Sequence, residues 1–197
     1  MQSPIYWHPA FYKFTMRMLY GSHYENRYTH LQKLVPDNCQ LLELCMGDLY
    51  LYENYLKNKN IQYSCADINP VFVKAARSKN VDSHLIDILK DEIPKSDYIL
   101  IQGAIYHAIP NELGLIDKLL NSAAKQLIIS ESVSNVSNSG NKIMSVIGAA
   151  LSKAKKGQSK IKFSRKTLKE TFKVYEKNII QWIEPPDSLE VIIVMQK

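Results

Sequence analysis

Long apolar runs are missing from this chain of 197 residues. Its longest apolar stretches have about eight residues, whereas a helix that crosses a bilayer needs about 20. The start of the chain, Met1-Gln2-Ser3-Pro4, has neither the basic nor the apolar region of a secretory signal peptide. These absences predict a soluble, cytoplasmic protein with no transmembrane segment.

Cysteine is scarce and histidine is scattered. The three cysteines, Cys39, Cys45 and Cys65, have no metal-ligand spacing, and their odd number argues against a disulfide framework. We expect them to be reduced thiols. The five histidines include no pair four residues apart beside an acid, so we predict no metal site.

Three signatures of common enzyme classes are also absent. There is no glycine-rich loop ending in Lys-Ser or Lys-Thr, which excludes the P-loop class. There is no Gly-x-Ser-x-Gly elbow of the kind that marks many hydrolases. The three-glycine fingerprint of NAD-dependent dehydrogenases is incomplete, which disfavours that class.

Positive charge is distributed unevenly. The net charge is +6, and the segment from Lys153 to Lys177 carries ten lysines and arginines against only Glu170 and Glu176. Such a segment could face nucleic acid or anionic lipid. A solvated surface without a partner is the simpler alternative.

The chain changes character near residue 38. Residues Phe11–Leu34 have the apolar spacing of two helices broken at Gly21-Ser22, and Pro36-Asp37-Asn38 forms a turn after them. We therefore expect residues 1–38 to form a helical extension and residues 39–197 to form one structural unit.

Short apolar runs alternate with helical segments beyond Gln40. Strands are expected at Leu41–Cys45, Ile61–Ala66, Val81–Ile86, Tyr98–Gln102 and Gln126–Ser130, and helices at Leu49–Lys57, Val71–Ser78 and, capped by Asn111, up to Ala124. This alternation predicts a parallel sheet with right-handed crossovers.

The tail has a different pattern. A helix is expected at Ile143–Leu151 and another, capped by Ser164, as far as Phe172; two strands, Val174–Ile183 and Leu189–Met195, follow. The link through Pro185-Pro186-Asp187-Ser188 is too short for a parallel return, so these strands must form a hairpin. The predicted fold is α/β: a seven-stranded, mostly parallel, doubly wound sheet with a terminal antiparallel hairpin, helices on both faces and an N-terminal helical lid.

Ligands of open parallel sheets bind outside the carboxyl ends of the strands. After the first strand, the run Glu43-Leu44-Cys45-Met46-Gly47-Asp48 has an acid and then a glycine before a helix, which lets the backbone approach a ligand closely. After the second strand, Asp67 stands where a carboxylate can accept hydrogen bonds from a ribose. Ordinary strand-to-helix turns are the alternative interpretation of both.

The next two strands also end in polar or small residues. Asp87-Ile88 follows the third strand, and Gln102-Gly103 follows the fourth, four residues before His107. Four consecutive strands that end in this way indicate one shared ligand site.

These motifs resemble those of the class I S-adenosylmethionine-dependent methyltransferases. The run Glu43–Leu49 is similar to their first motif, acidic-x-Gly-x-Gly-x-Gly, but Cys45 and Leu49 occupy two of the glycine positions. The segments Asp97–His107 and Lys162–Leu168 resemble the small-molecule branch of the family. The resemblance implies S-adenosylmethionine as cofactor, held by Glu43, Cys45, Gly47, Asp48, Asp67, Ile68, Asp87, Ile88, Gln102 and Gly103.

Within this resemblance, Asp67 matches the acid that holds the ribose, and Asp87 with Ile88 matches the position beside the adenine amino group. His107 is the candidate general base, because an unperturbed imidazole titrates near neutral pH. Tyr106 is expected to shape the acceptor pocket or contact the cofactor, and Glu131 and Asn135 to orient the acceptor. Structural roles are the alternative for each of these catalytic candidates.

The N-terminal extension is rich in aromatic residues. The resemblance implies that they close the site as a lid, and packing of the helices on the sheet is the alternative; these residues are Tyr6, Trp7, Tyr12, Tyr20, Tyr24 and Tyr28. Arg27, on the second of these helices, could neutralise a carboxylate of the cofactor.

The predicted function is methyl transfer to a small-molecule or lipid-like acceptor. Two alternatives stay open: an RNA methyltransferase that holds phosphates with the basic segment 153–173, and a non-catalytic, cofactor-binding subunit, which the altered glycine motif favours slightly. No feature of the sequence indicates an oligomeric state.

Overall fold

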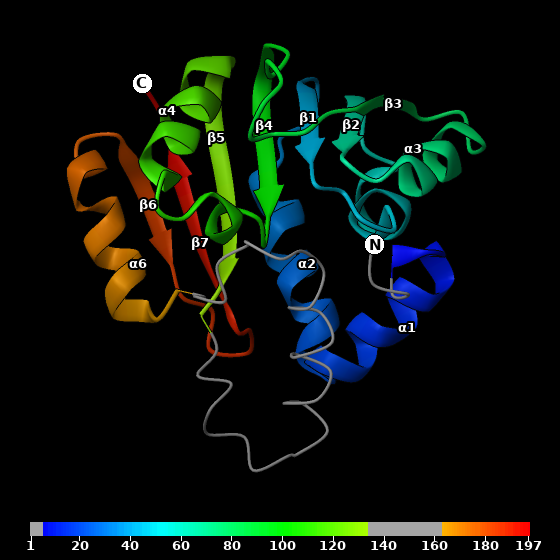
Figure 1. Ribbon diagram of the computed structural model, residues 1–197, viewed down its shortest axis with the longest axis horizontal. Coiled ribbons are helices and arrows are strands. Elements are labelled where there is room, and N and C mark those ends of the chain that lie inside the picture. Colours follow the sequence, from blue (N-terminus) through cyan, green and yellow to red (C-terminus); the bar gives the residue numbers. More distant parts are fainter. Residues whose placement is uncertain (1–5, 134–162) are drawn as a thin grey trace.

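The computed structural model describes residues 6–133 and 163–197. Within them the chain forms one seven-stranded sheet, in the order β3-β2-β1-β4-β5-β7-β6 (Figure 1). The strands are β1 (Gln40–Leu44), β2 (Gln62–Asp67), β3 (Asp82–Leu85), β4 (Ser96–Gln102), β5 (Ala123–Ser132), β6 (Ile179–Ile183) and β7 (Glu190–Met195). The pairs from β3 to β5 are parallel, and β7 runs antiparallel to both β5 and β6. The predicted sheet and its terminal hairpin are confirmed.

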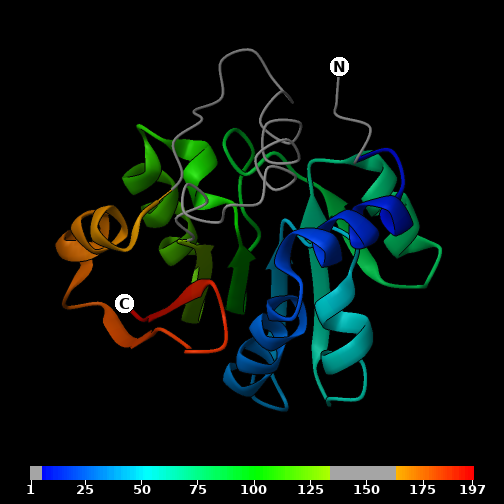
Figure 2. The ribbon, with the colours of Figure 1, turned by 90° about the horizontal axis from the view of Figure 1, so that it is seen from below.

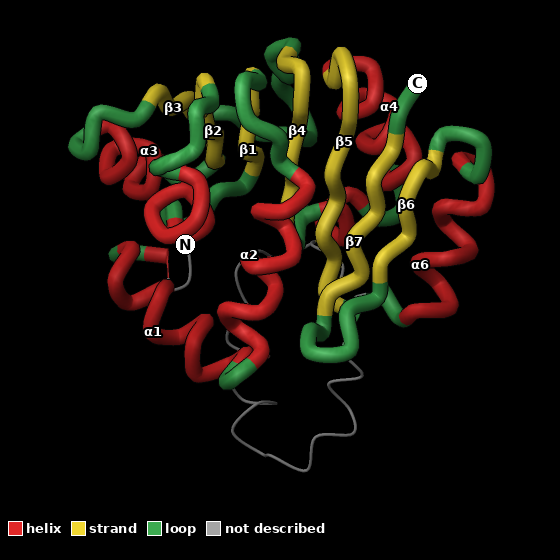
Figure 3. Tube along the Cα trace, turned by 180° about the vertical axis from the view of Figure 1, so that it is seen from behind, coloured by secondary structure: helices red, strands yellow, loops and turns green. Residues whose placement is uncertain are grey.

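Helices cover both faces of the sheet. They are α1 (Pro9–Tyr20), α2 (His23–Leu34), α3 (Pro70–Arg77), α4 (Glu112–Ser122) and α6 (Arg165–Phe172). One face packs on α4 and α6, and the other packs on α2 and α3; Figure 3 shows α2 lying across this second face. The predicted break between α1 and α2 is confirmed at Gly21, whose φ of 53° ends α1.

The central strands are apolar on both faces because helices bury both. Leu41 and Leu42 are neighbours on β1, and both are almost fully buried, in different clusters: Leu41 with α2 and Leu42 with α4. Leu100 and Ile101 divide in the same way on β4. Burial on both sides explains why these strands are continuous apolar runs in the sequence.

Two predicted elements differ from the structure. In place of the helix expected at Leu49–Lys57 there is a short π-helix, Tyr52–Leu56. Leu49 itself cannot belong to a right-handed helix, because its φ is 65°. The strand expected from Val174 begins only at Ile179. Residues Lys173–Tyr175 instead form a 3-10 turn, where the Tyr175 hydroxyl donates to Asp117 Oδ1 (2.7 Å) and fastens the turn to α4.

The two predicted caps have different outcomes. Ser164 caps α6 as expected, and it forms a reciprocal capping box with Thr167. Asn111 precedes α4 but its side chain accepts no capping hydrogen bond, and it lies against Gly114 instead. The expected helix Ile143–Leu151 and Asn135 lie outside the described residues. In the part of the chain that the structure describes, no helix is long and apolar enough to cross a membrane.

Candidate active site

The strand order reverses between β1 and β4, and this point divides the sheet into two halves. The carboxyl ends of β1 and β4 lie at the lower edge of the sheet in Figure 1, with α1 beneath it. Figure 2, seen from below, shows α1 and α2 on the side of the molecule that carries β1 and β2. In sheets of this type, ligands bind at this switch point.

The loop after β1 has a backbone that normally requires glycine. Cys45, Gly47 and Leu49 have φ values of 57°, 59° and 65°, so each of the three positions is left-handed. A non-glycine residue in this conformation costs about 1–2 kcal/mol. Leu49 offsets that cost because its side chain is buried with Phe72, and burial of a leucine contributes about 1.5–3 kcal/mol. The loop therefore keeps a left-handed backbone, which favours glycine, at Cys45 and Leu49, the two positions where the motif that it resembles has glycine.

Asp67, the last residue of β2, is bonded to this loop. Its Oδ2 accepts the N–H of Gly47 (3.1 Å), twenty residues earlier in the chain, and its Oδ1 accepts the N–H of Asn69 (2.8 Å). Burial raises the pKa of the Asp67 carboxyl to about 6. Its neighbour Ile68 is exposed. The structure thus joins two of the predicted cofactor-binding segments by a direct hydrogen bond.

Glu43 lies near the carboxyl end of β1 and is almost fully buried. Its Oε2 accepts from the Tyr63 hydroxyl (2.7 Å) and its Oε1 from Gln102 Nε2 (2.9 Å). Burial raises the pKa of the Glu43 carboxyl to about 7. Tyr63 was not among the predicted residues; a glutamate in an apolar strand beside a tyrosine of the next strand is the signal that would have indicated the pair.

Arg27 extends this network from α2. Its guanidinium donates to Gln102 Oε1 (3.3 Å) and lies 3.7 Å from Glu190 Oε1. It also lies 5.0 Å from the ring centroid of Tyr20 and 4.7 Å from that of Tyr28. Its Nε is buried and has no hydrogen-bond partner among the described residues. The polar chain Glu43–Gln102–Arg27 therefore ties the N-terminal extension to β1 and β4.

The turn after β4 carries the two aromatic catalytic candidates. Gly103 has a φ of 54°, and the 3-10 turn Ile105–Ala108 follows it. The rings of Tyr106 and His107 lie together, 4.0 Å between centroids, and burial raises the pKa of Tyr106. Glu131, buried at the end of β5, accepts the N–H groups of Ala104 (2.8 Å) and Ile105 (2.6 Å). Glu131 thus holds the backbone of the turn that carries Tyr106 and His107.

The three other predicted residues, Asp87, Ile88 and Asp48, differ in their contacts. Asp87 accepts from the N–H of Leu89 (3.1 Å) and ion-pairs with Lys90 (3.3 Å), while Ile88 is buried in the main core. Burial raises the pKa of Asp48, which lies in the loop after β1. The side chains of Asp87 and Ile88 therefore have structural partners in addition to any ligand.

The N-terminal aromatics divide into two groups. Tyr12 covers the loop: a Cβ on Gly47 would lie 3.0 Å from Tyr12 Cε1. Tyr6 lies beside it, with ring centroids 5.8 Å apart. Tyr24 and Tyr28 pack instead in the cluster against the sheet face, and Trp7 is exposed. Tyr6 and Tyr12 are thus the N-terminal aromatics that lie beside the loop, whereas Tyr24 and Tyr28 pack against the sheet.

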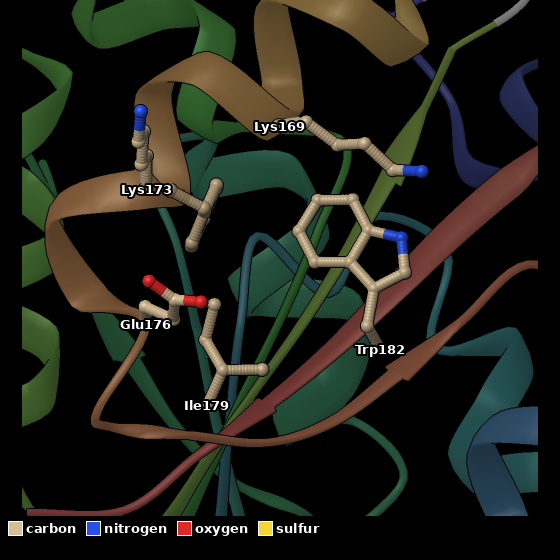
Figure 4. A pocket seen from close by; sticks show the side chains of 6 residues that line it. Lys169, Lys173, Glu176, Ile179 and Trp182 are labelled. Atoms are coloured by element: carbon tan, nitrogen blue, oxygen red, sulfur yellow. The ribbon is translucent and has the colours of Figure 1, made fainter.

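Two cavities lie elsewhere. One, of about 390 Å³, opens between α6, the turn after it and β6, and Figure 4 shows Lys169 beside the Trp182 ring with Lys173 and Glu176 across the opening. The other, of about 200 Å³, is lined by Gln40, Gln62, Asp82 and Ser96, where strands begin. The sequence did not indicate that Trp182 would lie beside the basic segment.

The sequence matches no protein-family model, and no curated protein is significantly similar to it. Solved structures are similar in fold. Human N-acetylserotonin methyltransferase in complex with S-adenosylmethionine superposes with a TM-score of 0.65 and 13% identity, over 98% of this chain and 57% of that one. PigF with S-adenosylhomocysteine has a TM-score of 0.66 and 13% identity, over 98% and 61%.

A third structure matches over similar lengths. It is the complex between the Haloferax volcanii Trm112 methyltransferase activator and the putative methyltransferase, with a TM-score of 0.65 and 12% identity over 89% of each chain. The present chain spans less than two thirds of the first two proteins. Together with the strand order and the terminal hairpin, these matches show that the chain has the fold of the class I S-adenosylmethionine-dependent methyltransferases.

Proposed function

We propose that this protein binds S-adenosylmethionine and transfers its methyl group to a small-molecule or lipid-like acceptor. The observation that carries the proposal is the loop after β1, which is left-handed at Cys45, Gly47 and Leu49 and is bonded to Asp67 at the switch point. Similar structures that contain S-adenosylmethionine or S-adenosylhomocysteine support it.

The residues of this edge fit the proposed cofactor. Asp67 would hold the ribose hydroxyls, the backbone around Gly47 would lie against the amino-acid part, and Asp87 with Ile88 would flank the adenine. Arg27 would face the cofactor carboxylate, since its Nε is buried without a partner among the described residues. Glu43, Cys45, Asp48, Ile68, Gln102 and Gly103 would complete the site. When bound, the cofactor supplies an electrophilic methyl group.

On the other side of the switch point, the turn after β4 would serve the acceptor. Methyl transfer is an in-line displacement, so the protein mainly aligns the acceptor and excludes water. His107 would accept the proton that an acceptor hydroxyl or amine loses, and Tyr106 would form a wall of the pocket. Glu131 is a positioning residue, because its bonds to Ala104 and Ile105 fix the turn beneath both side chains.

Thermal unfolding with S-adenosylmethionine, S-adenosylhomocysteine and NAD tests the cofactor. Ligand at about 100 times its dissociation constant adds about 2.7 kcal/mol of stability, which in a domain of this size raises Tm by about 5–11 °C. We expect that rise with both adenosyl ligands and none with NAD. An equal rise with NAD, or no rise at millimolar adenosyl ligand, would contradict the proposal. Cofactor binding without turnover of any acceptor would favour the non-catalytic subunit.

RNA methylation is the second candidate, and one contact favours it. Lys169 Nζ lies 5.9 Å from the ring centroid of Trp182, and Lys173 lines the same cavity. Tertiary structure thus places an aromatic ring, on which a base could stack, beside cations that could hold phosphates. Residues 153–162 of the basic segment lie outside the described residues. The candidate predicts binding of single-stranded RNA that weakens with salt and is lost in Trp182→Ala; no binding at low salt would exclude it.

A further inference from the structure

One face of α1 presents large apolar side chains to solvent. Trp7, just before the helix, and Phe11, Phe14 and Met18 within it are 61%, 49%, 61% and 59% exposed. Their spacings of four, three and four residues place them on one side of a helix. We call these four residues the α1 stripe. Apolar residues that gather in this way on a surface mark an interaction site.

The opposite face of α1 is already used by the fold. Tyr12 packs on Gly47, Thr15 is buried, and Met16 and Tyr20 pack against the cluster beneath α2. Folding therefore packs one side of the helix against the rest of the protein, while the α1 stripe on the other side stays exposed.

The charges around the stripe indicate which partner fits. The first acidic residue of the chain is Glu25, so residues 1–24 carry Lys13 and Arg17 and no carboxylate side chain. Both cations lie on one flank of the stripe, where Lys13 Nζ lies over the Tyr50 ring and Arg17 bonds to Glu25. An apolar face with tryptophan and phenylalanine beside a cationic flank is typical of helices that lie in a membrane interface. The protein as a whole is also cationic, with a net charge of +6.

We propose that α1 docks this protein on an anionic lipid surface through Trp7, Phe11, Phe14 and Met18. The same helix covers the loop after β1 through Tyr12, so docking places the carboxyl edge of the sheet next to the lipid. If the proposed methyl transfer holds, on which this one consequence rests, the edge would receive an acceptor directly from the membrane.

Vesicle binding of the full chain tests the docking. Because the protein has two tryptophans, Trp182→Phe leaves Trp7 as the only fluorescent indole. We expect this protein to sediment with vesicles that contain phosphatidylglycerol, with a blue shift of Trp7 emission, and to bind pure phosphatidylcholine vesicles more weakly. High salt should reduce the binding.

The double variant Phe14→Glu, Met18→Glu should bind anionic vesicles at least about tenfold more weakly, because transfer of side chains of this size from water is worth that factor or more. Val174→Glu is the matched control, since Val174 is 70% exposed on the turn after α6 and is expected to change nothing. No binding to anionic vesicles, or equal binding by both variants, would overturn the proposal. A dimer in lipid-free solution that the double variant abolishes would show that the stripe binds a second copy.

Calorimetry with S-adenosylmethionine on the same double variant separates this proposal from the proposed function. Lost vesicle binding with retained cofactor binding supports docking by the stripe and shows that the fold is intact. Vesicle binding by a protein that does not bind the cofactor would leave the docking standing and contradict the proposed function alone.

Discussion

The turn after β1 and the turn after β4 are both fastened by a buried carboxylate from the neighbouring strand. Asp67 of β2 accepts the N–H of Gly47, and Glu131 of β5 accepts the N–H groups of Ala104 and Ile105. They differ in how the carboxylate is used. Asp67 divides its oxygens between the loop and its own strand end, whereas one oxygen of Glu131 binds two amides of the same turn.

This difference separates the loop of the proposed cofactor site from a turn that presents side chains. The loop after β1 has three left-handed residues, while the turn after β4 is a short 3-10 helix that carries Tyr106 and His107. A carboxylate at a strand end is therefore not by itself evidence of ligand contact. If the two turns have separate roles, substitutions in the first turn change cofactor affinity and substitutions in the second change the rate.

The largest expected effect is on the second turn. His107→Asn should lower kcat by about 10²–10⁴-fold, because it removes the proposed general base while keeping a polar side chain. The dissociation constant for S-adenosylmethionine, measured by calorimetry, should change little. Equal losses in rate and cofactor affinity would show that the two turns do not have separate roles.

Asp67→Asn should weaken S-adenosylmethionine binding by about 100-fold at pH 8, since each hydrogen bond to a charged group is worth about 1.5–3 kcal/mol. In the unmodified protein, affinity should fall about tenfold per pH unit below pH 6, as Asp67 becomes protonated. The variant should lack this pH dependence. If calorimetry between pH 5 and pH 8 gives parallel curves for both proteins, Asp67 does not hold the cofactor.

Ionisation of Asp67 has opposite effects on binding and on folding: it is expected to raise cofactor affinity, but it lowers the stability of the folded protein. Burial raises the pKa of Asp67 above its ordinary value of 3.8 to about 6, so its contribution to stability is full below pH 3.8 and is lost as pH rises through 6. In the proposed site, the ionised Asp67 lowers the stability of the free protein but strengthens binding of the ligand. Ionisable groups with pKa values perturbed in this way are typical of binding sites.

Glu131→Gln should destabilise the protein by about 1.5–3 kcal/mol in urea unfolding, because the charge of the acceptor for two amides is lost. Affinity for S-adenosylmethionine should stay within about threefold of the original, a difference of less than about 1 kcal/mol. A large loss of affinity with unchanged stability would place Glu131 in contact with the cofactor.

The smallest effect is expected at Cys45. Cys45→Gly relieves left-handed strain of about 1–2 kcal/mol, but glycine also loses about 0.5–1 kcal/mol of additional backbone entropy on folding. We expect a net change in unfolding free energy of less than about 1 kcal/mol. Cys45→Val, with a branched Cβ at a φ of 57°, should destabilise the protein by more than that. Equal stabilities for glycine and valine would show that the loop backbone adapts.

Most elements could be predicted because their signals are local. Apolar runs and turn residues placed all seven strands, and Gly21 and Ser164 marked a helix break and a helix start. The errors arose where contacts between residues far apart in the sequence determine the local structure. Leu49 is left-handed because burial beside Phe72 offsets the strain, and residues 173–175 form a turn because Tyr175 is bonded to α4.

The sequence alone determined the α/β class, the sheet with its terminal hairpin and the polar residues at the strand ends, since these depend on residue type and spacing along the chain. Tertiary structure alone decided which of those residues meet. It bonded Asp67 to Gly47 and Glu131 to Ala104, placed Tyr12 over the loop, and left one face of α1 exposed. Side-chain partners depend on strand order and helix packing, which join segments that local patterns cannot relate.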